Sequence, residues 1–133
     1  MLLDINEPFV IRLEEVEYVG GPLPSFRSKL DLEFVISNSL FSLEAVYIWF
    51  ESEKWEIFKR NVKLLNEFER NFDISLNDMS DNFEFKIFTK ERFFDRIYLS
   101  LRLKMTYLNK KEFNVSYEDY ISRSELHLLR RSV

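Results

Sequence analysis

The sequence predicts an α+β domain: a curved, mainly antiparallel sheet of six to seven strands, with one principal helix packed across a face and a short C-terminal helix. Two observations predict this class. Over most of the chain, apolar residues alternate with polar ones, as in strands that bury one face. Between residues 52 and 68 the apolar spacing changes to that of a helix, and a helix with one apolar stripe needs another layer to cover it.

The composition predicts one domain with an aromatic core. The 133 residues are expected to form a single domain, 1–133, which is large enough to bury a core without covalent cross-links. The 14 Phe, six Tyr and two Trp supply much of the bulky apolar surface. The absence of cysteine excludes disulfides and thiolate metal sites. The two glycines, Gly20 and Gly21, cannot form a glycine-rich phosphate loop.

Charge and hydropathy favour a cytoplasmic protein with a protein partner. Met1–Pro8 carries Asp4 and Glu7 where a secretory signal would carry positive charge. No uncharged apolar run in the sequence reaches the ~18 residues that span a bilayer, so no membrane partner is expected. The net charge of −4 disfavours nucleic acid as a partner and favours a basic protein.

The first half of the chain predicts three strands. The apolar phase of the first strand shifts by one residue near Glu14 and Glu15, which indicates a β-bulge. Residues 20–24 hold a cluster of Gly and Pro and are expected to form a loop. Residues 37–39 suit a tight turn. The strands are expected at residues 9–18, 30–36 and 40–50.

The segment that follows predicts the principal helix. Its large apolar residues fall at offsets of 0, 3, 7, 10 and 13, which places them on one helical face. Ser52 is the expected N-cap, and Glu53 and Glu56 lie in the first turn, where the helix dipole favours acidic groups. The buried face is expected to consist of Trp55, Phe58, Val62, Leu65 and Phe68.

The second half predicts a hairpin, a long strand, a short strand and a second helix. A polar turn at residues 77–82 separates the two strands of the hairpin. Ser116 with Asp119 three residues later resembles a capping box, which predicts a helix from Tyr117 to Arg130. This helix would bury Tyr120, Ile121, Ser124 and Leu128. The strands are expected at residues 72–76, 83–87, 97–107 and 113–115, with a turn at 109–111. The sequence shows no internal repeat.

The groups that could carry chemistry have structural explanations. His127 is the single histidine and lacks the partners that a metal site or a catalytic base requires, so a surface position is expected. Asp73, Asn77, Asp78, Asp81 and Asn82 could suggest calcium. They lack the central glycine and terminal glutamate of an EF-hand loop, and a hairpin turn explains them better. We expect no catalytic residue, no metal site and no cofactor.

One strand face interleaves basic and aromatic residues, as a platform for single-stranded nucleic acid would. It comprises Arg96, Tyr98, Arg102 and Lys104. The solvated face of an ordinary antiparallel strand can have the same composition, and the acidic total charge favours that interpretation.

Two acidic runs are the candidate partner-binding residues. Solubility and helix capping explain part of their charge, an acidic surface for a protein partner is the next interpretation, and acid–base catalysis is the third. The residues are Glu14, Glu15, Glu17, Glu51, Glu53 and Glu56.

The order of elements resembles a family of small bacterial immunity proteins that are encoded beside wall-associated or other polymorphic toxins. The resemblance lies in a strand ending in Phe34-Val35-Ile36, a helix that opens with Trp55-x-x-Phe58 and continues to Leu65, a Phe-rich hairpin, a long Leu strand and a closing Phe113-x-Val115-Ser116. It implies a non-enzymatic protein that neutralises a cognate toxin, with a basic toxin domain as partner. Such proteins act by binding, so the resemblance supplies no catalytic residue.

Two other functions stay open. A small-ligand-binding module would hold its ligand in an aromatic cleft of ~300 Å³ or more between helix and sheet. A structural subunit of phage or mobile-element origin would assemble with itself. The sequence does not indicate the oligomeric state.

Overall fold

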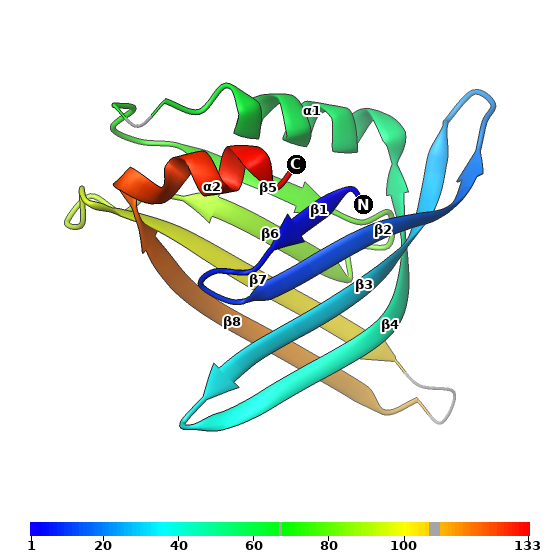
Figure 1. The fold of residues 1–133 in the computed structure, drawn as a ribbon. Coiled ribbons are helices and arrows are strands. Elements are labelled where there is room, and N and C mark those ends of the chain that lie inside the picture. The colour runs from blue at the N-terminus through cyan, green and yellow to red at the C-terminus, as the bar shows by residue number, and fades with distance from the viewer. Residues whose placement is uncertain (67, 107–109) are drawn as a thin grey trace.

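A computed structural model describes residues 1–66, 68–106 and 110–133. Within these residues the chain forms two antiparallel sheets of four strands each (Figure 1). The first sheet contains β1 (Leu3–Ile5), β2 (Val10–Val19), β3 (Ser25–Ile36) and β4 (Ser39–Glu51). The second contains β5 (Asp73–Asn77), β6 (Phe83–Phe88), β7 (Arg96–Thr106) and β8 (Glu112–Ser122). Helix α1 (Ser52–Lys63) joins the sheets, and a 3-10 turn η1 (Arg123–Glu125) leads into α2 (Leu126–Arg131).

The α+β class and the antiparallel pairing are confirmed, but the expected single sheet of six to seven strands is wrong. Each half of the chain forms a complete four-stranded meander followed by a helix. The two sheets face each other and their strands cross in Figure 1. Two crossed sheets bury their inner faces against each other. One helix on a single sheet would cover only part of the apolar face of that sheet.

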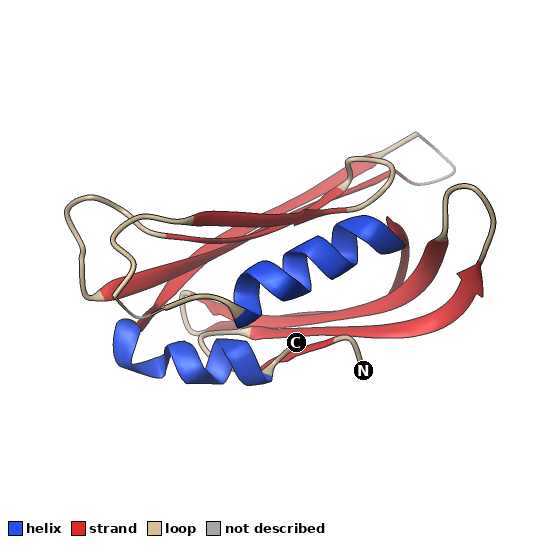
Figure 2. Ribbon diagram, turned by 90° about the horizontal axis from the view of Figure 1, so that it is seen from above, coloured by secondary structure: helices blue, strands red, loops and turns tan. Residues whose placement is uncertain are grey.

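The core lies between the sheets and extends to α1. Figure 2 shows α1 lying between the sheets, and Figure 1 shows it along the upper end of the molecule. The ring of Trp55 meets that of Phe26 on β3 at 6.5 Å between centroids, and the ring of Phe58 meets that of Phe85 on β6 at 6.0 Å. The helix therefore joins both sheets, since its buried face contacts one ring from each.

Four of the five residues expected on the buried face of the helix are buried: Trp55, Phe58, Val62 and Leu65. Phe68 is the exception, because 83% of its surface is exposed. The helix ends at Lys63 and Leu64 is its C-cap, so the helical conformation does not continue to residue 68. The helical spacing of apolar residues in the sequence therefore extends beyond the end of the helix itself.

The predicted bulge in β2 is confirmed, and β4 contains a second one. The register between β2 and β3 shifts between Glu15 and Glu17. In β4, Ala45 has a φ of 55°, and its N–H donates to the Asp31 carboxylate at 2.9 Å. The β3–β4 register shifts at this point, which changes the residues of β4 that face the core. Before the bulge Phe41 and Leu43 pack against the core, and after it Val46, Ile48 and Phe50 do so.

The helix predicted from Tyr117 to Arg130 is wrong over its first half. Residues 112–122 form β8, which pairs with the full length of β7. The capping box exists, but six residues later, between Ser122 and Glu125. Of the four residues expected to be buried, Ile121 is buried, whereas Tyr120, Ser124 and Leu128 are exposed. Leu126 and Leu129 fill the core from α2 instead.

Tyr117 of β8 connects the second sheet to the first. Its ring stacks on Phe34 at 4.5 Å between centroids and meets the edge of Phe9 at 5.3 Å. Its hydroxyl donates to the backbone oxygen of Val35 at 3.3 Å. Burial raises the pKa of Tyr117, and the nearby charge of Asp119 raises it further.

Several smaller expectations can be compared with the structure. Ser37 and Asn38 form the tight β3–β4 turn with positive φ, as predicted. The two ends of the chain lie together, and the N–H of Asp4 donates to the oxygen of Ser132 at 3.0 Å. Three residues within the predicted ranges 52–68, 97–107 and 109–111 lie outside the described part of the chain: Glu67, Tyr107 and Asn109.

Candidate functional site

A groove of about 300 Å³ opens where α1 begins, beside the end of β2 and the start of β3. It brings one residue from each of the two acidic runs to a common site, although these residues lie about 40 positions apart in the sequence. It is lined by Leu2, Glu15, Tyr18, Phe26, Ser52, Trp55 and Glu56.

The groove exists because β2 is longer than its neighbour β1. Strand β1 pairs only with Ile11–Leu13, so the edge of β2 from Glu14 to Val19 has no strand beside it in the described chain. All six of these residues are exposed. The N–H of Ser52 donates to the oxygen of Pro24 at 2.9 Å, which ties the start of α1 to the end of this β2–β3 hairpin.

The base of the groove is aromatic. Phe26 and Trp55 are almost fully buried, with 3% and 4% of their surface exposed. Tyr18 pairs with Phe26 across the strands but stays 60% exposed. A tyrosine that presents its ring to solvent beside carboxylates can contact both apolar and cationic groups of a partner. Tyr18 was not predicted as a functional residue from the sequence, because its alternation with Val16 resembles that of a core strand.

The six candidate glutamates do not form one surface. Glu15 lies opposite the buried Ser28 and therefore faces the groove. The bulge turns Glu17 to the outer face of the sheet, where it pairs with Arg27 at 3.4 Å. Glu14 lies opposite Lys29 on the same outer face. The acidic run on β2 is thus divided between the two faces.

The acidic run at the start of α1 is divided as well. Glu56 reaches the groove, whereas the partly buried Glu51 lies 4.0 Å from the exposed Lys54 in an ion pair. Glu53 lies in the first turn, as expected. The expectation that Ser52 caps the helix is wrong: Glu51 occupies the N-cap position, since β4 runs directly into the helix, and no side chain caps it.

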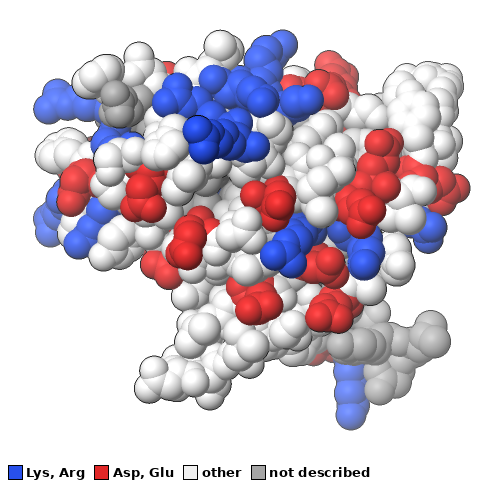
Figure 3. Space-filling model, viewed as in Figure 1, with Lys and Arg blue, Asp and Glu red and all other residues white. Residues whose placement is uncertain are grey.

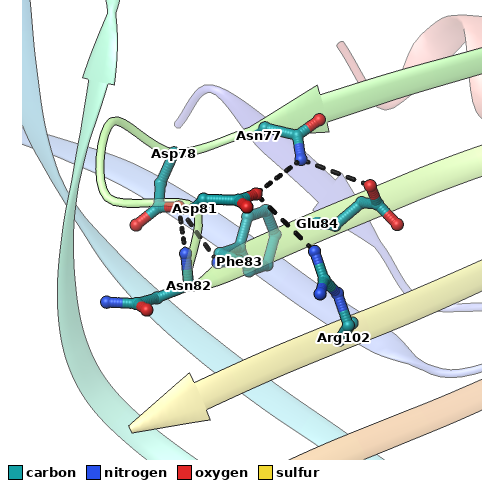
Figure 4. Close-up of polar contacts among 7 residues, drawn as sticks. All are labelled: Asn77, Asp78, Asp81, Asn82, Phe83, Glu84 and Arg102. Carbon is teal, nitrogen blue, oxygen red and sulfur yellow. Dashed lines mark hydrogen bonds and ion pairs between the residues drawn. The ribbon is translucent and has the colours of Figure 1, made fainter. Parts of the chain in front are cut away.

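The oxygen-rich β5–β6 turn is a structural turn, as predicted. The Asp78 carboxylate is buried and accepts the N–H groups of Asn82 at 2.8 Å and Phe83 at 3.0 Å. Figure 4 shows the Asn77 amide between Asp81 and Glu84, and Arg102 reaching Asp81 from β7. The carboxylates are occupied by donors within the chain. No group of His, Asp and Glu side chains suited to a metal ion occurs in the described residues.

The basic and aromatic face of β7 forms a surface cluster under the β6–β7 loop. Tyr98 is buried and stacks on Phe88 at 5.7 Å, while the Lys90 ammonium lies 4.2 Å above its ring centre. Lys90 also pairs with Glu118 at 2.7 Å. A side-chain hydrogen bond with Tyr98 raises the pKa of Arg96. Many of the cations here already have partners, with Arg102 bound to Asp81 and Lys104 to Glu112.

His127 lies at the surface, where it was expected from the sequence. His127 is exposed on α2, and its Nδ1 lies 3.0 Å from the oxygen of Ser124. None of the described helices combines the length and apolar character needed to cross a bilayer.

Comparisons with family models, with curated proteins and with solved structures find no significant match for this chain. The groove between β2 and α1 is therefore the feature on which a proposal can rest. It offers two carboxylates and an exposed aromatic ring over an apolar base, which suits recognition of a basic side chain more than a reaction.

Proposed function

We propose that this chain is a non-enzymatic cytoplasmic binding protein whose partner is a basic protein domain, and that it neutralises a toxin by covering the toxin's active site. One observation carries the proposal: the fold brings Glu15 and Glu56 to one groove beside Tyr18 and Trp55. The resemblance in element order to small immunity proteins and the net charge of −4 agree with it.

The groove has the two components that protein interfaces use. Exposed carboxylates accelerate encounter with a basic surface and select against acidic ones. Aromatic residues near the centre of an interface supply most of the affinity, and Tyr and Trp are the most frequent among them. Tyr18 is accessible for this purpose, while Trp55 holds the base of the groove in place.

Co-expression with a toxin tests the proposal. The product of a toxin-like reading frame beside the gene should arrest growth, and this chain should restore it. The double variant Glu15→Lys/Glu56→Lys should lose protection by at least ~100-fold in surviving cells, since two attractive pairs become repulsive. The matched control Glu33→Lys/Glu44→Lys places the same charges on exposed residues outside the groove and should protect fully. Protection by the groove variant equal to that of the control would contradict the proposal.

A small-ligand-binding module is the second candidate, because a groove of about 300 Å³ reaches the lower size limit of ligand sites. The aromatic rings between the helix and the sheets leave little room for a ligand, because they pack against one another. The ring centroids of Phe26 and Phe50 lie 5.7 Å apart, and those of Trp55 and Phe58 lie 5.8 Å apart. Saturable quenching of Trp55 fluorescence by a small aromatic ligand would favour this candidate. Concentration-dependent assembly in light scattering would instead favour a structural subunit.

A further inference from the structure

The end of the molecule that carries the helices is basic, although the chain as a whole is acidic. Residues 59–70 and 123–131 together contain seven Lys and Arg against three Glu. With a total of −4, the rest of the chain carries a net charge of −8. Figure 3 shows blue side chains gathered over α1 and α2, and red ones spread over the strands below. Figures 1 and 2 both place the two helices side by side.

Four cations on the helices are available to a partner. In the described part of the chain no ion pair engages Arg60, Lys63, Arg130 or Arg131. Elsewhere most strand cations, such as Arg102 and Lys104, are paired with acids. The acidic residues of α1, Glu53 and Glu56, lie in its first half, away from this basic end.

Large apolar side chains project from the same end. Phe68 is 83% exposed, the highest value among the large apolar residues described, and Leu64 is 70% exposed. Leu64 follows Arg60 by four positions and therefore lies on the same side of α1, away from the buried face. The N–H of Phe68 donates to the Asn66 side chain at 2.9 Å.

We propose that this surface docks on an anionic lipid bilayer. We call it the helical surface and define it by Arg60, Lys63, Leu64, Phe68, Arg130 and Arg131. Cations attract the protein to acidic headgroups, and projecting Leu and Phe side chains enter the boundary between headgroups and acyl chains. The strength of such binding grows with the apolar area that enters the boundary and with the attraction to acidic headgroups, and this surface offers both contributions.

Lipid fits these observations better than other anionic partners. A nucleic acid would be held by cations with stacked rings, and the helical surface presents one aromatic ring for stacking, that of Phe68. An acidic protein would leave Leu64 and Phe68 without a counterpart unless it also carried an apolar pocket. No membrane partner was expected from the sequence, because hydropathy reveals only segments that cross a bilayer, and a peripheral surface contains no such segment. The proposal is independent of the groove and of the proposed function.

Vesicle co-sedimentation of the full chain tests the proposal. At ~0.15 M salt the protein should bind vesicles of phosphatidylcholine and phosphatidylglycerol on the order of tenfold more tightly than vesicles of phosphatidylcholine alone. Arg60→Glu/Lys63→Glu should remove this preference. Leu64→Ser/Phe68→Ser should weaken binding severalfold without changing the charge. All four residues are exposed, so both variants should keep the circular dichroism spectrum of the wild type.

Two control variants carry the same changes at the opposite end of the molecule. Lys110→Glu/Lys111→Glu reverses two exposed cations, and Val35→Ser/Leu40→Ser removes two exposed aliphatic side chains from the β3–β4 hairpin. Both controls should bind like the wild type. Equal binding to the two vesicle types, or equal losses in the helical variants and the controls, would overturn the proposal. Binding to acidic proteins without binding to vesicles would overturn it as well.

Discussion

Single residues show where burial, and not residue type, decides the outcome. Phe58 and Phe68 look alike in the sequence, but Phe58 is 1% exposed between the two sheets and Phe68 is 83% exposed. Phe58→Ala should lower the free energy of unfolding by about 3–5 kcal/mol, because a large cavity would remain. Phe68→Ala should change it by ~0.5 kcal/mol or less. Urea denaturation measures both, and a comparable loss in the two variants would contradict the position of Phe68.

Asp78 and Asp73 also differ in burial, because Asp78 is buried and Asp73 is exposed. The Asp78 carboxylate is 7% exposed and accepts two backbone N–H groups of the β5–β6 turn. Asp78→Ala should lower the free energy of unfolding by about 1–3 kcal/mol, since a buried and a part-buried backbone donor lose their acceptor. Asp73→Ala removes an exposed ion pair with Lys86 and should cost less than ~1 kcal/mol. Thermal denaturation of both variants decides whether the turn depends on Asp78.

Among the elements, the C-terminal segment shows that tertiary contacts can override a local helix signal. Ser116–Asp119 and Ser122–Glu125 both resemble a capping box in the sequence, and β-strand pairing with β7 decides between them. Ser122→Ala should lower stability by about 1 kcal/mol through loss of the cap. Ser116→Ala, on an exposed position within β8, should change it by a few tenths (~0.3 kcal/mol). A larger loss of stability for Ser116→Ala than for Ser122→Ala in chemical denaturation would contradict β8 and support the helix that was predicted to start at Tyr117.

Elements with a strong local pattern were predictable from the sequence. The β5–β6 hairpin, the bulge in β2 and the buried face of α1 through Leu65 follow from alternation and helical spacing. The bulge at Ala45 was not predictable from the sequence, because its cause is a hydrogen bond to Asp31 on another strand. The groove was predictable only in part: both acidic runs were found, but which glutamates share a face depends on the bulge and on the short length of β1.

For the whole molecule, the sequence indicated the strands but not their division into sheets. A hairpin turn brings neighbouring strands together, so local signals predict each pair. Nothing local states that the eighth strand stays on a different sheet from the first. That division depends on distant rings, such as Phe50 of β4 against Phe83 of β6 at 5.8 Å. The two halves repeat the order of four strands and a helix without a repeated sequence.

The central claim is that α1 joins both sheets and thereby places Glu56 beside Glu15. Nuclear Overhauser effects between aromatic rings in a selectively labelled sample measure this directly. We expect contacts of Trp55 with Phe26 of the first sheet and of Phe58 with Phe85 of the second, in the same molecule. Contacts of the helix with the rings of one sheet alone would contradict the fold and remove the groove on which the proposed function rests.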